Sequence, residues 1–132
     1  MVIADGNGLP LSLFVSSASR AEITLLESTI AHRFLKCKLR RLIGDAAYDS
    51  DKHDKRLRRA GIELIAPNRP NRINFSQDRR KLRRYKRRWL IERLNAWLQN
   101  FRRIVVRYER SSQNFLAFLQ FAAAAILARQ LQ

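Results

Sequence analysis

The sequence predicts an α/β fold in which helices pack on a mixed β-sheet. Two apolar runs flank the glycine-rich stretch Asp5–Gly8 near the start of the chain, which is typical of a β-hairpin. Short apolar strands then alternate with segments of helical period, and the chain ends in two long helical segments. With 132 residues, 46% of them hydrophobic, the chain is long enough to bury a core without disulfides.

The first part of the chain divides into a hairpin and a helix. We expect strands at residues 1–4 and 9–17, because the Asp-Gly and Asn-Gly steps between them supply the positive φ angles of a tight turn. Over residues 19–35 the apolar residues recur every three or four positions, which indicates a helix. Ser19 and Glu22 have the spacing of a capping box at its start.

The middle of the chain alternates strands with one helix. A short apolar strand is expected to end at Asp45. A helix is expected at residues 51–60, with Ser50 as its N-cap and Gly61 as the residue that ends it. The next strand, residues 62–68, is stopped by proline.

Two helices are expected in the last third, at residues 78–100 and 112–130. The apolar run of the second is shorter than the roughly 18 residues of a membrane-spanning helix and contains Gln120, so we interpret it as a core helix. The aromatic side chains of both helices are expected in the core rather than as platforms for nucleic-acid bases: Trp89, Trp97, Phe115, Phe118 and Phe121.

The chain carries a formal net charge of +16, and most of its Lys and Arg lie between Lys55 and Arg110. This excess favours a polyanionic partner, with nucleic acid first and a membrane surface as the competing choice. The arginine-rich stretches are interpreted as DNA contacts that weaken steeply with salt, although a solvated charge run is the alternative for any one of them. The single cysteine, Cys37, is expected to be a small buried residue.

Arg88 lies three positions and Glu92 seven positions after Tyr85, so the three residues share one face of the expected helix. One interpretation is a surface ion pair between Arg88 and Glu92, which contributes only about 0.2–0.5 kcal/mol. The other makes Glu92 a metal ligand that Arg88 steers, while neighbouring cations hold a phosphate backbone.

Asp45 ends a short apolar strand and is followed by two small residues. A carboxylate at the carboxyl end of a strand in an open α/β sheet lies where ligands usually bind. The alternative is a turn aspartate that accepts a backbone hydrogen bond. Asp49, Asp51 and Asp54 are expected to cap the next helix or to face solvent.

The residues resemble a known family. The stretch LIGDAAYDSDKHDKRLRRAGIELIAPNRPNR, the spaced Tyr85, Arg88 and Glu92, and the tail FRRIVVRYER occur in the order found in the DDE transposases of bacterial insertion sequences. The resemblance also takes in DGNGLPLSLFVSSAS and EITLLE, so it covers nearly the whole chain. It implies a ribonuclease H-like mixed sheet with flanking helices, incomplete at the N-terminus because the first strand is missing.

The resemblance implies Mg²⁺-dependent strand cleavage and strand transfer at transposon ends. Asp45 would be the second catalytic acid and Glu92 the third, both as ligands of a two-metal site, because hard cations prefer carboxylate oxygens. DNA-binding residues would lie near these acids and in the tail: Arg84, Arg87, Arg88, Arg102, Arg103 and Tyr85.

Two positions depart from the family's pattern. Gln99 stands where the signature often continues with a lysine, and Arg102 and Arg103 are the candidates to replace its backbone contact. The family's first aspartate lies on a strand that precedes the hairpin opening this chain. Asp5 is the alternative ligand, but it lies in a turn where aspartate is favoured for backbone reasons.

We therefore interpret residues 1–132 as a partial transposase catalytic domain. Cleavage would need an N-terminal fragment supplied from a neighbouring reading frame. One alternative is an inactive truncated remnant that acts at most as a basic DNA-binding protein, and another is a basic protein that binds structured RNA. We expect the protein in the bacterial cytoplasm, in association with the nucleoid. We expect no membrane partner, and a homo-oligomer is possible.

Overall fold

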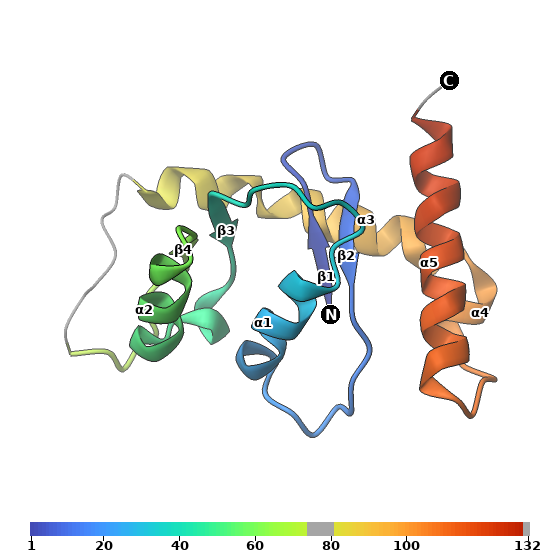
Figure 1. Cartoon of the computed structure of the whole chain (residues 1–132), viewed down its shortest axis with the longest axis horizontal. Coiled ribbons are helices and arrows are strands. Elements are labelled where there is room, and N and C mark those ends of the chain that lie inside the picture. Colours follow the sequence, from blue (N-terminus) through green and yellow to red (C-terminus); the bar gives the residue numbers. More distant parts are fainter. Residues whose placement is uncertain (74–80, 131–132) are drawn as a thin grey trace. The chain divides into compact units, whose positions relative to one another are not determined.

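The structure is a computed structural model that describes residues 1–73 and 81–130, with the side chains of residues 81–84 outside the description. The chain divides into two compact units, drawn in Figure 1. Unit 1 comprises Met1–Leu35 and Trp89–Gln132, and unit 2 comprises Lys36–Arg88. The α/β class is confirmed, but the described strands form two two-stranded sheets in place of the single mixed sheet that the sequence predicts.

The hairpin of unit 1 forms as expected, although its second strand is shorter. Strand β1 (Val2–Ala4) pairs antiparallel with β2 (Pro10–Leu13), and Val2 lies opposite Leu13. Gly8 adopts a φ of 83°, the left-handed conformation that the turn requires. The Asp5 Oδ1 atom accepts the backbone N–H groups of Asn7 and Leu9, each at 2.8 Å, which closes the turn.

Helix α1 (Glu22–Ala31) follows the hairpin and buries Leu25, Leu26 and Ile30. The predicted capping box is wrong. The N-cap residue is Ala21, which has no side chain that can accept a hydrogen bond, and the Ser19 hydroxyl lies 2.8 Å from the Ser17 hydroxyl instead. The helix thus begins later than a cap at Ser19 would allow.

Unit 1 contains an apolar core built from the hairpin and the C-terminal helices. Helix α3 (Trp89–Gln99) packs on β1, and α5 (Ser112–Arg129) packs on β2. A short helix that the sequence did not predict, α4 (Arg102–Val105), lies between them in the chain. The buried side chains of this core are Leu13, Leu94, Leu98, Ala122, Ala123 and Ile126.

Two of the aromatic residues expected in the core are exposed. Trp89 is 52% exposed and Phe121 is 79% exposed, so the expectation is wrong for both. On α5 the positions that face the core are Ala122, Ala123 and Ile126, and Phe121 falls outside this stripe. The other three aromatic residues that were expected in the core are half-buried: Trp97, Phe115 and Phe118.

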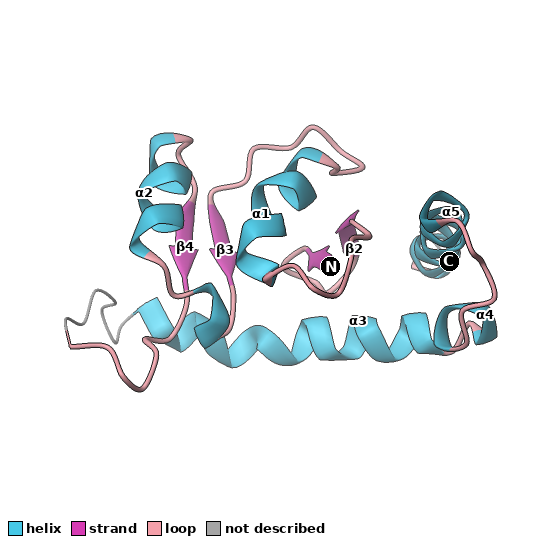
Figure 2. Cartoon of the chain, turned by 90° about the horizontal axis from the view of Figure 1, so that it is seen from below, coloured by secondary structure: helices cyan, strands magenta, loops and turns pink. Residues whose placement is uncertain are grey.

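Unit 2 is a strand–helix–strand arrangement. Strand β3 (Arg41–Ile43) pairs in parallel with β4 (Glu63–Ile65), and helix α2 (Asp51–Arg59) connects them and packs on β4, as Figure 2 shows. Gly61, with a φ of 75°, follows the helix and donates its N–H to the Arg58 carbonyl at 3.0 Å. This is the predicted helix end.

The long helix predicted at residues 78–100 divides into two parts. A 3-10 segment, η2 (Lys81–Arg88), precedes α3, and residues 78–80 lie outside the described residues. Cys37, expected to be buried, is exposed, because it lies in the segment without regular structure that leads into β3. Among the helices of the described residues, none combines the length and the apolarity needed to cross a membrane.

Candidate active site and nucleic-acid interface

Asp45 of unit 2 follows β3 by two residues and begins a single 3-10 turn, η1 (Ala46–Tyr48). Its Oδ1 atom accepts the N–H of Ala47 at 2.8 Å, and its carbonyl accepts the N–H of Tyr48 at 3.1 Å. The interpretation of Asp45 as a turn aspartate is therefore confirmed for one carboxylate oxygen. The half-buried carboxylate has a second oxygen, which accepts no hydrogen bond from the described residues, so a ligand role remains open to it.

The residue before Asp45 must be glycine for a packing reason. A Cβ atom on Gly44 would lie 2.9 Å from the ring of Tyr48, closer than real Cβ contacts allow. The N–H of Gly44 also donates to the carbonyl of Ile65 at 3.0 Å, which joins this segment to the end of β4. The Gly-Asp-Ala-Ala-Tyr sequence thus folds into a compact turn that fixes the position of the Asp45 backbone.

Arginines from the loop after β4 hold this turn from the other side. Arg69 donates its side-chain N–H groups to the carbonyls of Ala46 (3.2 Å) and Ala47 (3.0 Å), and its backbone N–H to Asp49 Oδ2 at 2.9 Å. Arg72 donates to both Asp49 and Asp51. The PNRPNR stretch is therefore a clamp on the segment that carries Asp45.

The Asp49–Arg72 pair is largely shielded from solvent, with side chains that are 4% and 16% exposed. The expectation that Asp49 caps a helix or faces solvent is therefore wrong, because loop residues far along the chain cover it. Hydrogen bonding to Asp51, together with the nearby charge of Asp49, raises the pKa of the Arg72 guanidinium above its usual value. Arg72 is thus a permanently charged structural residue.

Glu92 lies on the exposed side of α3 in unit 1. The buried residues of this helix, Leu90, Leu94 and Leu98, are spaced four apart and face the core. Because they fix the rotation of α3 about its axis, Glu92 is held toward solvent. The Glu92 side chain therefore lies on the exposed face of α3.

Arg93, next to Glu92, is a residue that the sequence analysis missed. Its guanidinium lies 4.9 Å from the ring centroid of Trp89 and 4.7 Å from that of Trp97, and it donates to the carbonyl of Asn7 in the hairpin turn. The three side chains are spaced four apart on one helix, which is the signal that could have revealed the stack. The stack ties the Glu92-bearing helix to the hairpin.

Of the residues predicted to bind DNA in η2, two make a local pair. Arg88 donates from Nη1 to the Tyr85 hydroxyl at 2.7 Å, and its guanidinium carbon lies 5.6 Å from the ring centroid of Tyr85. A 3-10 segment brings residues three apart directly over one another, which accounts for this contact. Arg87 is exposed, and the side chain of Arg84 lies outside the described residues.

Arg102 and Arg103 are both exposed but differ in their contacts. The Arg103 guanidinium lies 4.8 Å from the ring centroid of Phe118 and 3.6 Å from Glu109 Oε1. Arg107 likewise lies 5.2 Å from the ring centroid of Phe115. Arg102 makes no side-chain contact of this kind with the described residues, so it is the freer of the two predicted DNA ligands.

The donor set that the sequence predicts for a metal consists of carboxylates, which suits Mg²⁺. Asp45 belongs to unit 2 and Glu92 to unit 1, and the meeting of their carboxylates stays a prediction. Within the described residues, no three His, Cys, Asp or Glu side chains gather into a group that could hold a metal ion. Asp5, the alternative first ligand, already uses Oδ1 to close its turn.

Comparison with known proteins places the chain in a family. The family model of the transposase DDE domain matches residues 1–127. A Burkholderia cepacia protein named "Putative transposase for insertion sequence element IS402" is 31% identical over 133 residues, which cover 95% of this chain and 60% of that protein. No solved structure matches.

The chain thus spans about three fifths of the length of this curated relative. The family match covers both the segment that carries Asp45 and the helix that carries Glu92. On these two matches, the chain belongs to the DDE transposases, the transposases of insertion sequences.

Proposed function

We propose that this chain acts in DNA transposition by binding transposon-end DNA and contributing Asp45 and Glu92 to a Mg²⁺ site for strand cleavage and strand transfer. The observation that carries the proposal is the family match over both acids. The local structure supports it, because the clamp around Asp45 and the buried leucines of α3 fix the backbone beneath each acid. We further propose that residues 1–132 form part of one catalytic domain.

Bound Mg²⁺ would activate the attacking water or 3′-hydroxyl and stabilise the leaving oxygen. Asp45 would bind it through the oxygen that does not cap η1, and Glu92 through an exposed carboxylate. The remaining acidic ligand is proposed to come from a preceding segment of the transposase, carried by an N-terminal fragment from an adjacent reading frame. Cleavage by this chain alone is then expected to be very weak.

DNA binding is proposed to rest on exposed cations. Arg87 and Arg102 are exposed, and Arg88, which donates to the Tyr85 hydroxyl, is exposed as well. With a net charge of +16, the affinity of the chain for DNA should fall steeply as salt is raised. Association with the nucleoid would follow from this charge.

The test combines the chain with an N-terminal transposase fragment, Mg²⁺ and labelled DNA from the ends that flank its gene. Glu92→Gln and Asp45→Asn should each abolish cleavage while DNA affinity stays within about twofold, because each removes a metal ligand and no cation. Asp54→Asn is the matched control, since Asp54 is an acid of unit 2 that pairs with Arg58 on helix α2. Unchanged cleavage in the Glu92 variant would remove Glu92 from the site.

The alternative function is a catalytically inactive remnant that acts as a basic DNA-binding protein. The net charge of +16 is the observation that favours it. It predicts salt-sensitive DNA binding and no cleavage with any fragment. A preference for RNA over DNA of equal length and charge would instead support the third interpretation.

A further inference from the structure

One peptide group in the η1 turn connects an arginine to Asp45 by hydrogen bonds at both of its ends. The N–H of Ala47 donates to Asp45 Oδ1 at 2.8 Å. The carbonyl of the same peptide group belongs to Ala46, and it accepts a hydrogen bond from Arg69 Nε at 3.2 Å. Arg69 Nη2 also donates to the next carbonyl, that of Ala47, at 3.0 Å. We call the connection from Arg69 through this peptide group to Asp45 the relay.

The relay strengthens the hold on one oxygen of the carboxylate. A cation that donates to a peptide carbonyl polarises the amide, so the N–H at the other end of the amide becomes a better donor. Arg69 thereby strengthens the bond from the Ala47 N–H to Asp45 Oδ1. Because Oδ1 is held in the turn, rotation of the carboxylate is restricted. Its second oxygen, which accepts no hydrogen bond from the described residues, is left for a ligand.

The Arg69 side chain starts from a fixed point of the backbone. The backbone N–H of Arg69 donates to Asp49 Oδ2 at 2.9 Å, and the Asp49 side chain is only 4% exposed. The other carboxylate oxygen of Asp49 accepts from Arg72, and the backbone N–H of Asp49 donates to the Ala46 carbonyl at 3.2 Å. One shielded acid thus holds both the backbone of Arg69 and the turn that the Arg69 guanidinium contacts.

We propose that Arg69 is a positioning residue for Asp45, which acts through the peptide group between Ala46 and Ala47 to keep Oδ1 in the turn and the second oxygen available to a divalent cation. The inference rests on the proposed function, because it takes Asp45 as a metal ligand. Arg69 itself needs to touch neither the cation nor the DNA. Its loss should weaken metal binding about tenfold, the equivalent of one hydrogen bond.

The competing role for Arg69 is a phosphate contact, because its side chain is exposed. The two roles need different properties of the side chain. A phosphate contact needs a positive charge, which lysine also supplies, whereas the relay needs nitrogen donors at two fixed points of a planar guanidinium. Both observed hydrogen bonds of the guanidinium go to carbonyls of the η1 turn, which favours the relay. Replacement of Arg69 by lysine therefore separates the two roles.

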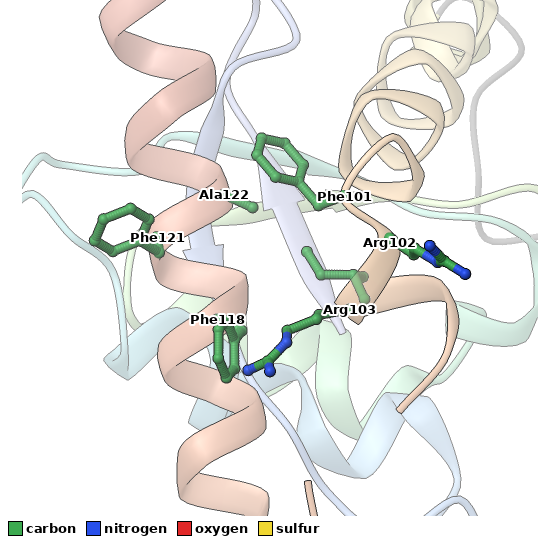
Figure 3. A pocket seen from close by; sticks show the side chains of 7 residues that line it. Phe101, Arg102, Arg103, Phe118, Phe121 and Ala122 are labelled. Atoms are coloured by element: carbon green, nitrogen blue, oxygen red, sulfur yellow. The ribbon is translucent and has the colours of Figure 1, made fainter. Parts of the chain in front are cut away.

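Arg69 differs from the two arginines at an open cavity of unit 1, which has a volume of about 230 Å³ (Figure 3). There the Arg103 side chain lies beside Phe118, and it pairs with Glu109 at 3.6 Å. The Arg102 guanidinium points away from α5. Arg103 is thus engaged with a ring and an acid, whereas Arg69 is engaged with the backbone of the η1 turn.

The experiment uses the whole chain, labelled for nuclear magnetic resonance, and Mn²⁺ as the probe cation. Mn²⁺ takes the same oxygen ligands as Mg²⁺, and its unpaired electrons broaden the signals of nearby amides. In the unmutated chain Mn²⁺ should broaden the Ala47 amide signal, and Asp45→Asn should remove this broadening. Arg69→Gln and Arg69→Lys should each raise the Mn²⁺ concentration that gives half of the broadening about tenfold.

A second readout needs no metal. Hydrogen exchange at the Ala47 amide should be about tenfold faster in both Arg69 variants, because the N–H loses the polarised carbonyl at the other end of its peptide group. Arg58→Gln is the matched control, since it removes one positive charge from unit 2, where Arg58 is 72% exposed and pairs with Asp54. It should leave the exchange and the Mn²⁺ response unchanged. The amide signals of β3 and β4 check that each variant keeps its fold.

Three results would overturn the positioning role. One is unchanged exchange at Ala47 in Arg69→Gln, and another is faster exchange with an unchanged Mn²⁺ response, which would make Arg69 a purely structural residue. The third is recovery of both readouts in Arg69→Lys, which would show that charge alone is enough.

The same measurements separate this inference from the proposed function. If the Ala47 signal does not broaden, or if the broadening survives Asp45→Asn, Asp45 is not a metal ligand and both proposals fail at this residue. If the exchange and Mn²⁺ results are as expected but the chain and the N-terminal fragment cleave no DNA, the positioning role stands and the proposed catalytic function fails.

Discussion

The two units of this protein use arginine in different ways. In unit 2, Arg69 and Arg72 bind carbonyls and carboxylates and hold the loop after β4 against the Asp45 turn. In unit 1, Arg93 and Arg103 lie on aromatic rings of α3 and α5. A net charge of +16 therefore overstates the number of cations that can bind DNA, because a group of arginines is already engaged in folding.

The units also differ in what holds them together. Unit 1 has a continuous apolar core between the hairpin and two helices, in which Leu13 and Leu94 are 1% and 0% exposed. Unit 2 buries fewer large side chains and adds a clamp of ion pairs and side chain-to-backbone hydrogen bonds. Unit 1 should therefore respond most to the loss of apolar volume, and unit 2 to the loss of polar partners.

The largest expected effect is in the core of unit 1. Leu94→Ala should lower the free energy of unfolding by about 2–5 kcal/mol, because Leu94 is fully buried and its removal leaves a cavity. Both tryptophans of the chain lie on α3, so their fluorescence during guanidinium denaturation reports on this unit. Ala96→Ser, at an exposed position of the same helix, is the control and should change stability by less than about 0.5 kcal/mol. A similar loss in both variants would contradict the core assignment.

Replacing one glycine in each unit by alanine compares the two units at a similar backbone conformation. Gly8 and Gly61 have φ angles of 83° and 75°, so alanine should cost about 1–2 kcal/mol at either position. Gly8→Ala should cost more, because its Cβ would lie 2.7 Å from Arg93 Nη2, whereas the space at Gly61 is open. Gly6→Ala, also in open space, is the control. Equal costs at Gly8 and Gly61, measured by thermal unfolding, would show that Arg93 moves aside freely.

A smaller and more local effect is expected from the clamp of unit 2. Asp49→Ala should speed hydrogen exchange at the Arg69 amide, which donates to Asp49 at 2.9 Å, and it should lower the unfolding temperature modestly because Asp51 still binds Arg72. Asp54→Ala removes only the pair with Arg58, which is 72% exposed, and should leave that amide unchanged.

The pH dependence of the clamp has a definite sign. A raised pKa means that the stabilisation from Arg72 is complete below the usual arginine pKa and is lost only as the pH rises above it. Arg72 should therefore add no pH dependence near neutrality, and amide exchange at Arg69, corrected for its intrinsic rate, measures this. A loss of protection on going from neutral to moderately alkaline pH would contradict the assignment.

The smallest expected effect distinguishes two neighbouring arginines. Arg102→Gln should lower the slope of log affinity against log salt by about 0.9, the value for one phosphate contact on duplex DNA. Arg103→Gln should have a smaller effect on that slope but should loosen α4 from α5, because Arg103 contacts Phe118 and Glu109. Equal slope changes in the two variants would show that the aromatic contact does not restrain Arg103.

The sequence predicted elements whose causes are local. The Asp5–Gly8 turn, the helix end at Gly61 and the start of α5 at Ser112 follow from neighbouring residues and are present in the structure. Asp45 was predicted as a strand-end residue with two possible roles, and its turn role is confirmed. The family was also identified from short motifs in a fixed order, and the family model confirms it.

Several of the errors concern packing between distant parts of the chain. Phe121 was expected in the core because it is aromatic, but the alanines beside it fill the core face of α5. Asp49 was expected to cap a helix or face solvent, but Arg72, from the loop that follows β4 in the chain, covers it. The helix at residues 78–100 was predicted as uniform, and the structure has a 3-10 segment before α3.

Residue order alone determined most of the strands and helices, the large positive charge and the motifs that identify the family, because each depends on residues close together in the chain or on composition. Only the tertiary structure decided which cations are engaged, which rings are exposed and where a cavity lies beside them. The physical reason is that partners such as Arg72 for Asp49, or Phe118 for Arg103, are brought together by packing that no local pattern records.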